Sequence, residues 1–401
     1  MDRAIARLRS VVFVALGLVA CGPRDGVGES ATMGDETGGT GGPSSGATGE
    51  RTTGGATGAS EGEGATTGSA GGTGSPTSST GGVEPGMSAG CGKPPLHAAG
   101  GVQVSIDAGP AGDGTRGFFL SLPADYDPDQ AHRLILGYPG TDWVGEQIQP
   151  YLDLEDGAAS DEIFVYPDPL WRDFPGWGVL GGWVLGPNAA PADGDQDLVF
   201  TGALLDYMED SYCIDTGRVF ATGHSWGGDM AMVVSCFLGD RFRASVPVAA
   251  NRPYWFEEGG GGVVSCMGET AVWTMFGAGD DHFTWQDYPG QFGDECRDFW
   301  LTERGCVGVD AAVDLGIAAA GECVEYTGCA QPTRYCRYDA AFGHQRPDYY
   351  PAETMKFFRA EVGAGSSRSR VAGEDDDAVG LALAAQAAGL EGAEAGAGAG
   401  V

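Results

Sequence analysis

The chain has 401 residues, with 22 Lys or Arg against 56 Asp or Glu, so its formal net charge is −34. Such an acidic chain, with Lys93 and Lys356 as its two lysines, lacks the basic surface that nucleic acid or an anionic membrane would require. It also contains 71 glycines, a far larger share than the roughly 7% of average proteins. These glycines are unevenly distributed, and they divide the chain into segments of different character.

Residues 1–21 have the features of a secretory signal. Three arginines precede an apolar run at 11–20, which is about half as long as a membrane span. The run ends in the sequence LVAC, which resembles a bacterial lipobox with Cys21 as the lipidated residue. An ordinary signal peptide with an incidental cysteine is the alternative. Lipidation would place the protein at the outer cell surface, bound to the membrane only through acyl chains.

The remaining chain has two low-complexity segments and one candidate domain. Residues 22–90 contain 23 Gly and 21 Ser or Thr but no Leu, Ile, Phe, Tyr or Trp, which predicts a disordered tether. Residues 363–401 are acidic, rich in Ala and Gly and devoid of aromatic residues, which predicts a disordered tail. Residues 91–362 hold all nine Trp, all five His and nine of the ten Cys, and they are numerous enough for a single folded domain.

Within 91–362, short β-rich apolar runs alternate with longer helical patterns. The predicted strands are 102–106, 118–122, 134–138, 163–166, 219–222, 245–249, 272–276 and 334–338. The predicted helices are 197–210, 226–238, 288–304 and 352–361. This alternation predicts an α/β fold, with a mostly parallel central sheet, helices on both faces and an antiparallel start. Ligands of such sheets bind beyond the carboxyl ends of the strands.

A candidate nucleophile lies at Ser225, in the sequence GHSWG. This sequence matches G-x-S-x-G, the turn that exposes the serine of serine hydrolases. The pattern occurs by chance in so glycine-rich a chain, because Ser44, Ser60 and Ser88 of the tether match it equally well. Only Ser225 follows a predicted strand and precedes a predicted helix, so we expect it to be the nucleophile. The alternative is a glycine-rich turn without chemistry.

A serine hydroxyl needs a base, and the base needs a group that orients it. In the chain order typical of α/β hydrolases, the serine comes first, then the acid, then the histidine. The histidines that follow Ser225 are His282 and His344, so these two are the candidates for the base. His344 is preferred, because it lies in a loop between the last predicted strand and the last predicted helix. His224 is expected to pack within the turn.

The acid is predicted from the strand at 272–276, which ends in a glycine-rich loop followed by Asp280 and Asp281. Asp280 is the preferred candidate for the acid, and Asp281 is the alternative. The two residues could also belong to a solvent-exposed acidic loop without a catalytic role. A metal site at Asp280, Asp281 and His282 would need further spaced ligands, which the sequence does not supply. We therefore expect no metal and no cofactor.

Two backbone amides are expected to form an oxyanion hole. One is that of Trp226, directly after the nucleophile. The other is that of Thr141, with Gly140 as the alternative, in the loop after the strand at 134–138. A tight turn at this loop is compatible with that role.

Trp171, Trp177 and Trp183 lie in a glycine-containing loop before the helix at 197–210. Their rings could stack on a phenolic group or on sugars, or they could cap the core. Trp177 and Trp183 are the candidates for substrate contact.

The cysteines predict disulfides in an oxidising compartment. Cys213 precedes the strand that leads to Ser225, and Cys236 lies on the helix that follows it, so the strand and helix could bring the two together. A Cys213–Cys236 disulfide is expected. The odd total of nine cysteines leaves one unpaired. Five cysteines near the end of the domain are expected to pair among themselves or with Cys91, namely Cys296, Cys306, Cys323, Cys329 and Cys336.

Nearly all of 91–362 resembles the secreted feruloyl esterases and the related polyhydroxybutyrate depolymerase-like proteins of the α/β-hydrolase fold. The segments that carry the resemblance are IFVYP at 163–167, DLVF at 197–200, YCID at 212–215, RVFATGHS at 218–225, YTGC at 326–329 and the pair Gly343-His344. Where these families usually have His-Gly, this chain has Pro139-Gly140 and Phe276-Gly277, and Trp226 stands where Asn is common.

The resemblance implies a serine carboxylic ester hydrolase that works through an acyl-enzyme. Its substrate would be a feruloylated plant polysaccharide such as xylan, from which it would release hydroxycinnamic acids. One alternative is a depolymerase acting on a hydroxyalkanoate polymer such as poly(3-hydroxybutyrate). Another is a non-catalytic surface protein that binds its ligand on a hydrolase scaffold.

Overall fold

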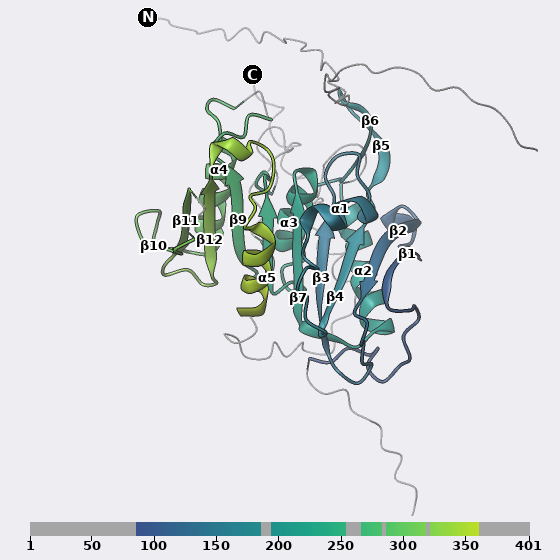
Figure 1. Cartoon of the computed structure of the whole chain (residues 1–401). Coiled ribbons are helices and arrows are strands. Elements are labelled where there is room, and N and C mark those ends of the chain that lie inside the picture. The colour runs from purple at the N-terminus through teal and green to yellow at the C-terminus, as the bar shows by residue number, and fades with distance from the viewer. Residues whose placement is uncertain (1–85, 186–193, 254–265, 283–285, 318–320, 361–401) are drawn as a thin grey trace, which may run out of the picture. The chain divides into compact units, whose positions relative to one another are not determined.

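The computed structural model describes residues 86–185, 194–253, 266–282, 286–317 and 321–360, all within one compact unit, Thr77–Val401. Within these residues, a ten-stranded sheet has the order β1-β2-β4-β3-β7-β8-β9-β12-β11-β10 (Figure 1). Its strands are β1 Gly100–Asp107, β2 Thr115–Leu122, β3 His132–Tyr138, β4 Glu162–Pro167, β7 Ile214–His224, β8 Ala244–Val248, β9 Ala271–Gly277, β10 Ala312–Asp314, β11 Glu322–Tyr326 and β12 Thr333–Tyr338.

The middle of the sheet is parallel and its margins are antiparallel. Neighbours from β4 to β12 run parallel, whereas β1 and β2 at one margin and β10 and β11 at the other pair antiparallel. Every residue of β8 and β9 is buried, as expected for parallel strands covered on both faces. The mostly parallel sheet with an antiparallel start, predicted from the sequence, is confirmed.

Helices cover both faces of the sheet. They are α1 Gly145–Leu152, α2 Gln196–Ser211, α3 Trp226–Phe237, α4 Gln291–Glu303 and α5 Tyr350–Ala360. One core cluster joins the sheet to α2, α3 and α4, and a second joins the opposite face to α1 and α5. Figure 1 shows α1 and α5 in front of the sheet. No helix in the described part of the chain is both long and apolar enough to span a membrane.

Some elements have no counterpart among the predicted ones. The helix α1 contains Pro150, which masks its helical pattern. The hairpin formed by β5 (Leu170–Phe174) and β6 (Gly178–Gly182) is short and largely exposed, so it lacks an apolar run. Every residue of β10 is exposed, so this strand also lacks an apolar run by which the sequence would predict it. In Figure 1 the hairpin projects at the top of the view, above the sheet.

Residues 86–90, which the composition assigns to the tether, pack against β7 and the chain before it. The Oγ of Ser88 donates a hydrogen bond to the carbonyl oxygen of Tyr212 (2.7 Å) and accepts one from the amide of Ile214 (2.9 Å). A Cβ on Gly90 would lie 2.3 Å from the same Tyr212 carbonyl oxygen. Ser88 thus has a structural role, although it matches the nucleophile pattern. Ser44, Ser60 and Cys21 lie outside the described residues.

The disulfides correct the predicted Cys213–Cys236 pair. The bonds are Cys91–Cys213, Cys236–Cys266, Cys306–Cys329 and Cys323–Cys336, and Cys296 is a buried free thiol.

Strand and helix geometry explain this error. Cys213 lies 12 residues before Ser225 and Cys236 lies 11 residues after it. An extended strand of that length covers about 40 Å, whereas the helix returns only about 17 Å. Cys236 therefore stops well short of the level of Cys213, and each cysteine bonds to a different segment.

Candidate active site

Ser225 lies in a strained turn between β7 and α3. Its φ of 58° and ψ of −127° are rarely populated by residues other than glycine, at a cost on the order of 1–3 kcal/mol. Its amide donates a hydrogen bond to the carbonyl oxygen of Val248 (3.1 Å) at the end of β8. A Cβ on Gly227 would lie 2.1 Å from the carbonyl oxygen of Tyr138. These contacts with the ends of β8 and β3 hold the sharp turn, which presents the serine at the carboxyl end of the sheet.

Three residues from different parts of the chain form a continuous hydrogen-bonded series at this turn. The Nε2 of His344 lies 2.8 Å from the Oγ of Ser225, and its Nδ1 lies 2.8 Å from the Oδ2 of Asp280. A carboxylate accepts, so Nδ1 carries the proton, and Nε2 accepts the hydrogen bond from the serine hydroxyl. Asp280 is fully buried. The arrangement can remove a proton from the serine and hold the resulting imidazolium.

The topology explains how His344 and Asp280 meet. Asp280 follows β9, and His344 follows β12 after the short 3₁₀ helix Ala340–Phe342. Because β9 and β12 are parallel neighbours, both loops emerge at the same edge. A Cβ on Gly277 would lie 2.2 Å from the carbonyl oxygen of Gly343, so a glycine there allows the loops to touch.

The alternatives left open by the sequence occupy different places. His344, rather than His282, contacts Ser225, while the ring of His282 stacks on that of His344 with centroids 4.1 Å apart and an interplanar angle of 9°. Asp280, rather than Asp281, contacts His344. The side chain of Asp281 is exposed.

His224 supports the backbone at His344. Its Nε2 donates a hydrogen bond to the carbonyl oxygen of His344 (2.6 Å). Burial, followed by the neighbouring His344, lowers the pKa of His224 to about 3. The ring is therefore neutral at neutral pH. The sequence indicated only a packed turn residue at this position, because a contact across 120 residues has no local signature.

The loop after β3 passes directly beside Ser225. A Cβ on Gly140 would lie 3.3 Å from the Cβ of Ser225. The loop is bound to β6, because the amide of Asp142 donates to the carbonyl oxygen of Gly181 (2.8 Å) and its Oδ1 accepts from the amide of Gly181 (2.9 Å). Thr141 lies between Gly140 and Asp142. Trp226 is the first residue of α3, at the positive end of the helix dipole.

The two tryptophans expected to contact substrate differ in their surroundings. Trp177 is 49% exposed, and its ring lies 6.2 Å from that of Trp226, which packs against Phe174 at 4.7 Å. Trp183 is 1% exposed, and its Nε1 donates to the carbonyl oxygen of Pro139 (2.8 Å). A buried ring offers no face to a ligand, which contradicts the substrate contact expected for Trp183. Instead, it positions the loop that contains Thr141.

A buried carboxyl group on α3 escaped the sequence analysis. Asp229 accepts hydrogen bonds from the amide of Asn251 (2.5 Å) and from its Nδ2 (3.4 Å). Burial raises the pKa of Asp229 to about 7. The one local sign was an acidic residue in the otherwise apolar stretch DMAMVV.

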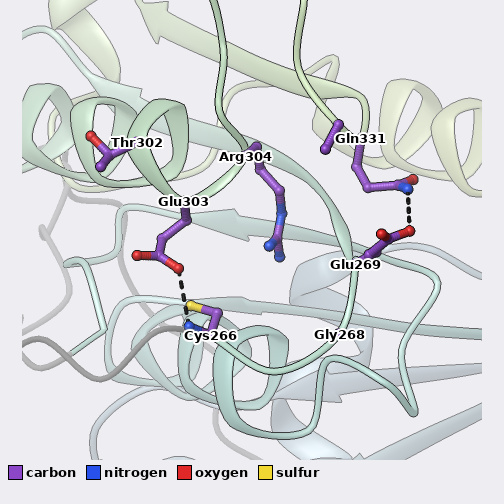
Figure 2. A pocket seen from close by; sticks show the side chains of 8 residues that line it. Cys266, Gly268, Glu269, Thr302, Glu303, Arg304 and Gln331 are labelled. Atoms are coloured by element: carbon purple, nitrogen blue, oxygen red, sulfur yellow. Dashed lines mark hydrogen bonds between the residues drawn. The ribbon is translucent and has the colours of Figure 1, made fainter.

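A polar cavity of about 350 Å³ lies elsewhere, lined by Cys266, Gly268, Glu269, Thr302, Glu303, Arg304, Ala330 and Gln331 (Figure 2). Its walls are joined to one another, since Glu303 accepts from the amide of Cys266 (3.0 Å) and Gln331 donates to Glu269 (2.9 Å). None of these residues belongs to the Ser225 site. In the described ranges, no group of three or more His, Cys, Asp or Glu is arranged to hold a metal ion.

Comparison with known proteins finds feruloyl esterases among the relatives of this chain. Feruloyl esterase C of Emericella nidulans is 28% identical over 285 residues, which cover 68% of this chain and 91% of that protein. Feruloyl esterase D of Neurospora crassa is 27% identical over 260 residues, covering 61% and 77%. Acetyl xylan esterase from Aspergillus awamori aligns structurally with 64% of this chain and 99% of its own, at 16% identity and a TM-score of 0.49. No protein-family model matches.

The strand order, together with the strained serine between β7 and α3, defines an α/β hydrolase. Its sequence is similar to the feruloyl esterases, as the motifs indicated. The chain is accordingly a carboxylic ester hydrolase. The four disulfides fit an oxidising, extracellular compartment.

Proposed function

We propose that the protein hydrolyses hydroxycinnamoyl esters of plant polysaccharide through an acyl-enzyme at Ser225. The observation that carries this proposal is the hydrogen-bonded series from Ser225 through His344 to Asp280. It supplies the nucleophile, the base and the orienting acid that ester cleavage by serine requires. The non-catalytic alternative has no observation in its favour.

In the first half of the reaction, Nε2 of His344 takes the proton of Ser225 as Oγ attacks the ester carbonyl carbon. The amides of Trp226 and Thr141 stabilise the oxyanion of the tetrahedral intermediate. The imidazolium, balanced by Asp280, then gives its proton to the leaving sugar oxygen. In the second half, water attacks the acyl-enzyme, His344 takes a proton from that water, and the proton returns to Ser225 as the acid leaves.

The substrate class is inferred from the names of the relatives and from the surface beside the nucleophile. The relatives are named feruloyl esterases. The exposed ring of Trp177 lies near that of Trp226, which directly follows Ser225, and a phenolic acyl group could stack on Trp177. The net charge of −34 favours a neutral ester over an anionic one.

Export and anchoring are part of the same proposal. Cleavage before a lipidated Cys21 would leave a tether ahead of residue 86, where the described fold begins, then the hydrolase domain and a tail at 363–401. The tether would then hold the domain at the outer cell surface within reach of polysaccharide. Mass spectrometry of the membrane fraction tests this, because an unmodified Cys21 would contradict it.

The decisive experiment compares methyl ferulate with a 3-hydroxybutyrate oligomer as substrates of the full chain. We expect hydrolysis of methyl ferulate, abolished by Ser225→Ala. Ser60→Ala is the matched control, since Ser60 lies in the same G-x-S-x-G pattern, and it should leave the rate unchanged. Preference for the oligomer would favour the depolymerase instead. Activity that survives Ser225→Ala would overturn the mechanism.

A further inference from the structure

A second imidazole covers the face of the His344 ring. The rings of His282 and His344 are nearly parallel, with centroids 4.1 Å apart and an interplanar angle of 9°. The amide of His282 donates a hydrogen bond to Oδ1 of Asp280 (3.1 Å), while Oδ2 of the same carboxylate accepts from His344 (2.8 Å). One buried carboxylate therefore fixes both the base and the residue stacked on it.

The hydrogen bonds of His344 to Asp280 and Ser225 act mainly within the plane of its ring. They lie along the ring nitrogens and resist movement within that plane. Contacts on the ring faces resist movement perpendicular to it. The ring of His224 lies 5.1 Å away at 55° and offers no flat contact. The parallel ring of His282 supplies one.

We propose that His282 is a positioning residue, whose stacked ring holds the imidazole of His344 between Asp280 and Ser225 during ester hydrolysis. The kinetic consequences of this inference rest on the proposed function. The inference does not depend on which ester is the substrate, because the stacking partner is the base itself.

The charges around His282 make its contribution depend on pH. Burial, and then the neighbouring His344, lower the pKa of His282, whereas Asp280 and Asp281 act in the opposite direction. Its ring is therefore neutral at neutral pH, where it can stack on the imidazolium of His344 that forms during the reaction. When His282 is protonated at low pH, its charge would repel the imidazolium that forms on His344 during the reaction. His224, with a pKa of about 3, stays neutral throughout.

Kinetics of two variants separate stacking from general structural support. Displacement of a catalytic group by about 1 Å can cost up to 10²-fold, so we expect His282→Ala to lower kcat about tenfold with KM within about twofold. His282→Phe keeps a flat ring and should restore kcat to within about threefold. His97→Phe, which changes a histidine bound to Tyr212 at the opposite end of β7, should have no effect on kcat. Unchanged kcat in His282→Ala, or equal loss in both His282 variants, would overturn the proposal.

The pH profile provides a readout that mere structural support would not move. In the wild-type protein, protonation of His282 should add a second step of up to about tenfold to the acid side of the kcat/KM profile. His282→Phe has no second ring to protonate, so its acid side should show a single ionisation. An acid side with the same shape in both proteins would contradict the role of His282.

A measurement without substrate keeps this inference apart from the proposed function. Proton NMR of the full chain should show a higher pKa of His282 in His344→Gln, because the neighbouring charge is removed. An unchanged pKa would show that the rings are not stacked in solution. Reaction with a fluorophosphonate tests the function separately, since failure to label Ser225 would refute the nucleophile and leave the NMR result standing.

Discussion

Replacing Asp280 by Asn tests the role of the buried carboxylate with almost no change of shape. Asp280 is fully buried, and its Oδ2 lies 2.8 Å from Nδ1 of His344. When His344 takes the serine proton, a new ion pair forms. At about 4 Å between charges and an effective dielectric constant of about 20, this pair contributes about 4 kcal/mol, or about three decades in rate.

The amide also disturbs the tautomer of the base, because an Asn side chain can present an N–H to Nδ1 and so leave the proton on Nε2. We therefore expect kcat of Asp280→Asn to fall by about 10³–10⁴-fold, with an unfolding midpoint within a few degrees of wild type. The assay is steady-state hydrolysis of methyl ferulate, and circular dichroism confirms folding.

Asp281→Asn is the matched control, since the neighbouring carboxyl group is exposed and the change of charge is the same. We expect its kcat to stay within about twofold of wild type. If Asp281→Asn abolished activity while Asp280→Asn retained it, the assignment of the acid would be wrong. Equal tolerance of both substitutions would refute the electrostatic argument itself.

Other substitutions test the loop, the buried acid and the disulfides. Gly140→Ala would place a methyl group 3.1 Å from the carbonyl oxygen of His224 and 3.3 Å from Cβ of Ser225, so kcat should fall about tenfold without loss of thermal stability. Because the pKa of Asp229 is raised to about 7 from about 3.9 in an unfolded chain, wild-type stability should fall by on the order of 4 kcal/mol as the pH rises from about 4 to about 7. Urea unfolding of Asp229→Asn should lack this decline, and an identical decline would contradict the burial argument. Non-reduced peptide mapping should recover Cys91 linked to Cys213. Loss of this bond by Cys91→Ala should lower the free energy of unfolding by about 5 kcal/mol, because the bond closes a loop with a sequence separation of 122. A Cys213–Cys236 peptide would refute the observed pairing.

The amino-acid sequence by itself determined the features that depend on neighbouring residues. The strand, turn and helix around Ser225 are encoded by local hydrophobic patterns and by Gly223 and Gly227, which the sharp turn requires. The mostly parallel sheet follows from alternating strands and helices, because parallel neighbours need crossover connections. The places of Asp280 and His344 were predictable for the same reason, since each follows a recognisable strand and such strands end at one edge of the sheet.

Only the tertiary structure decided features that depend on which distant segments meet. Trp177 and Trp183 are six residues apart (183 − 177), yet the first is half exposed and the second is buried against the chain after β3. The partner of Cys213 lies 122 residues away, and the ring of His282 meets that of His344 across 62 positions of sequence (344 − 282). Local patterns report propensity and burial within an element, but they carry no information on contacts between elements. Packing of the whole sheet and its loops fixes those contacts, and with them the surroundings of the base.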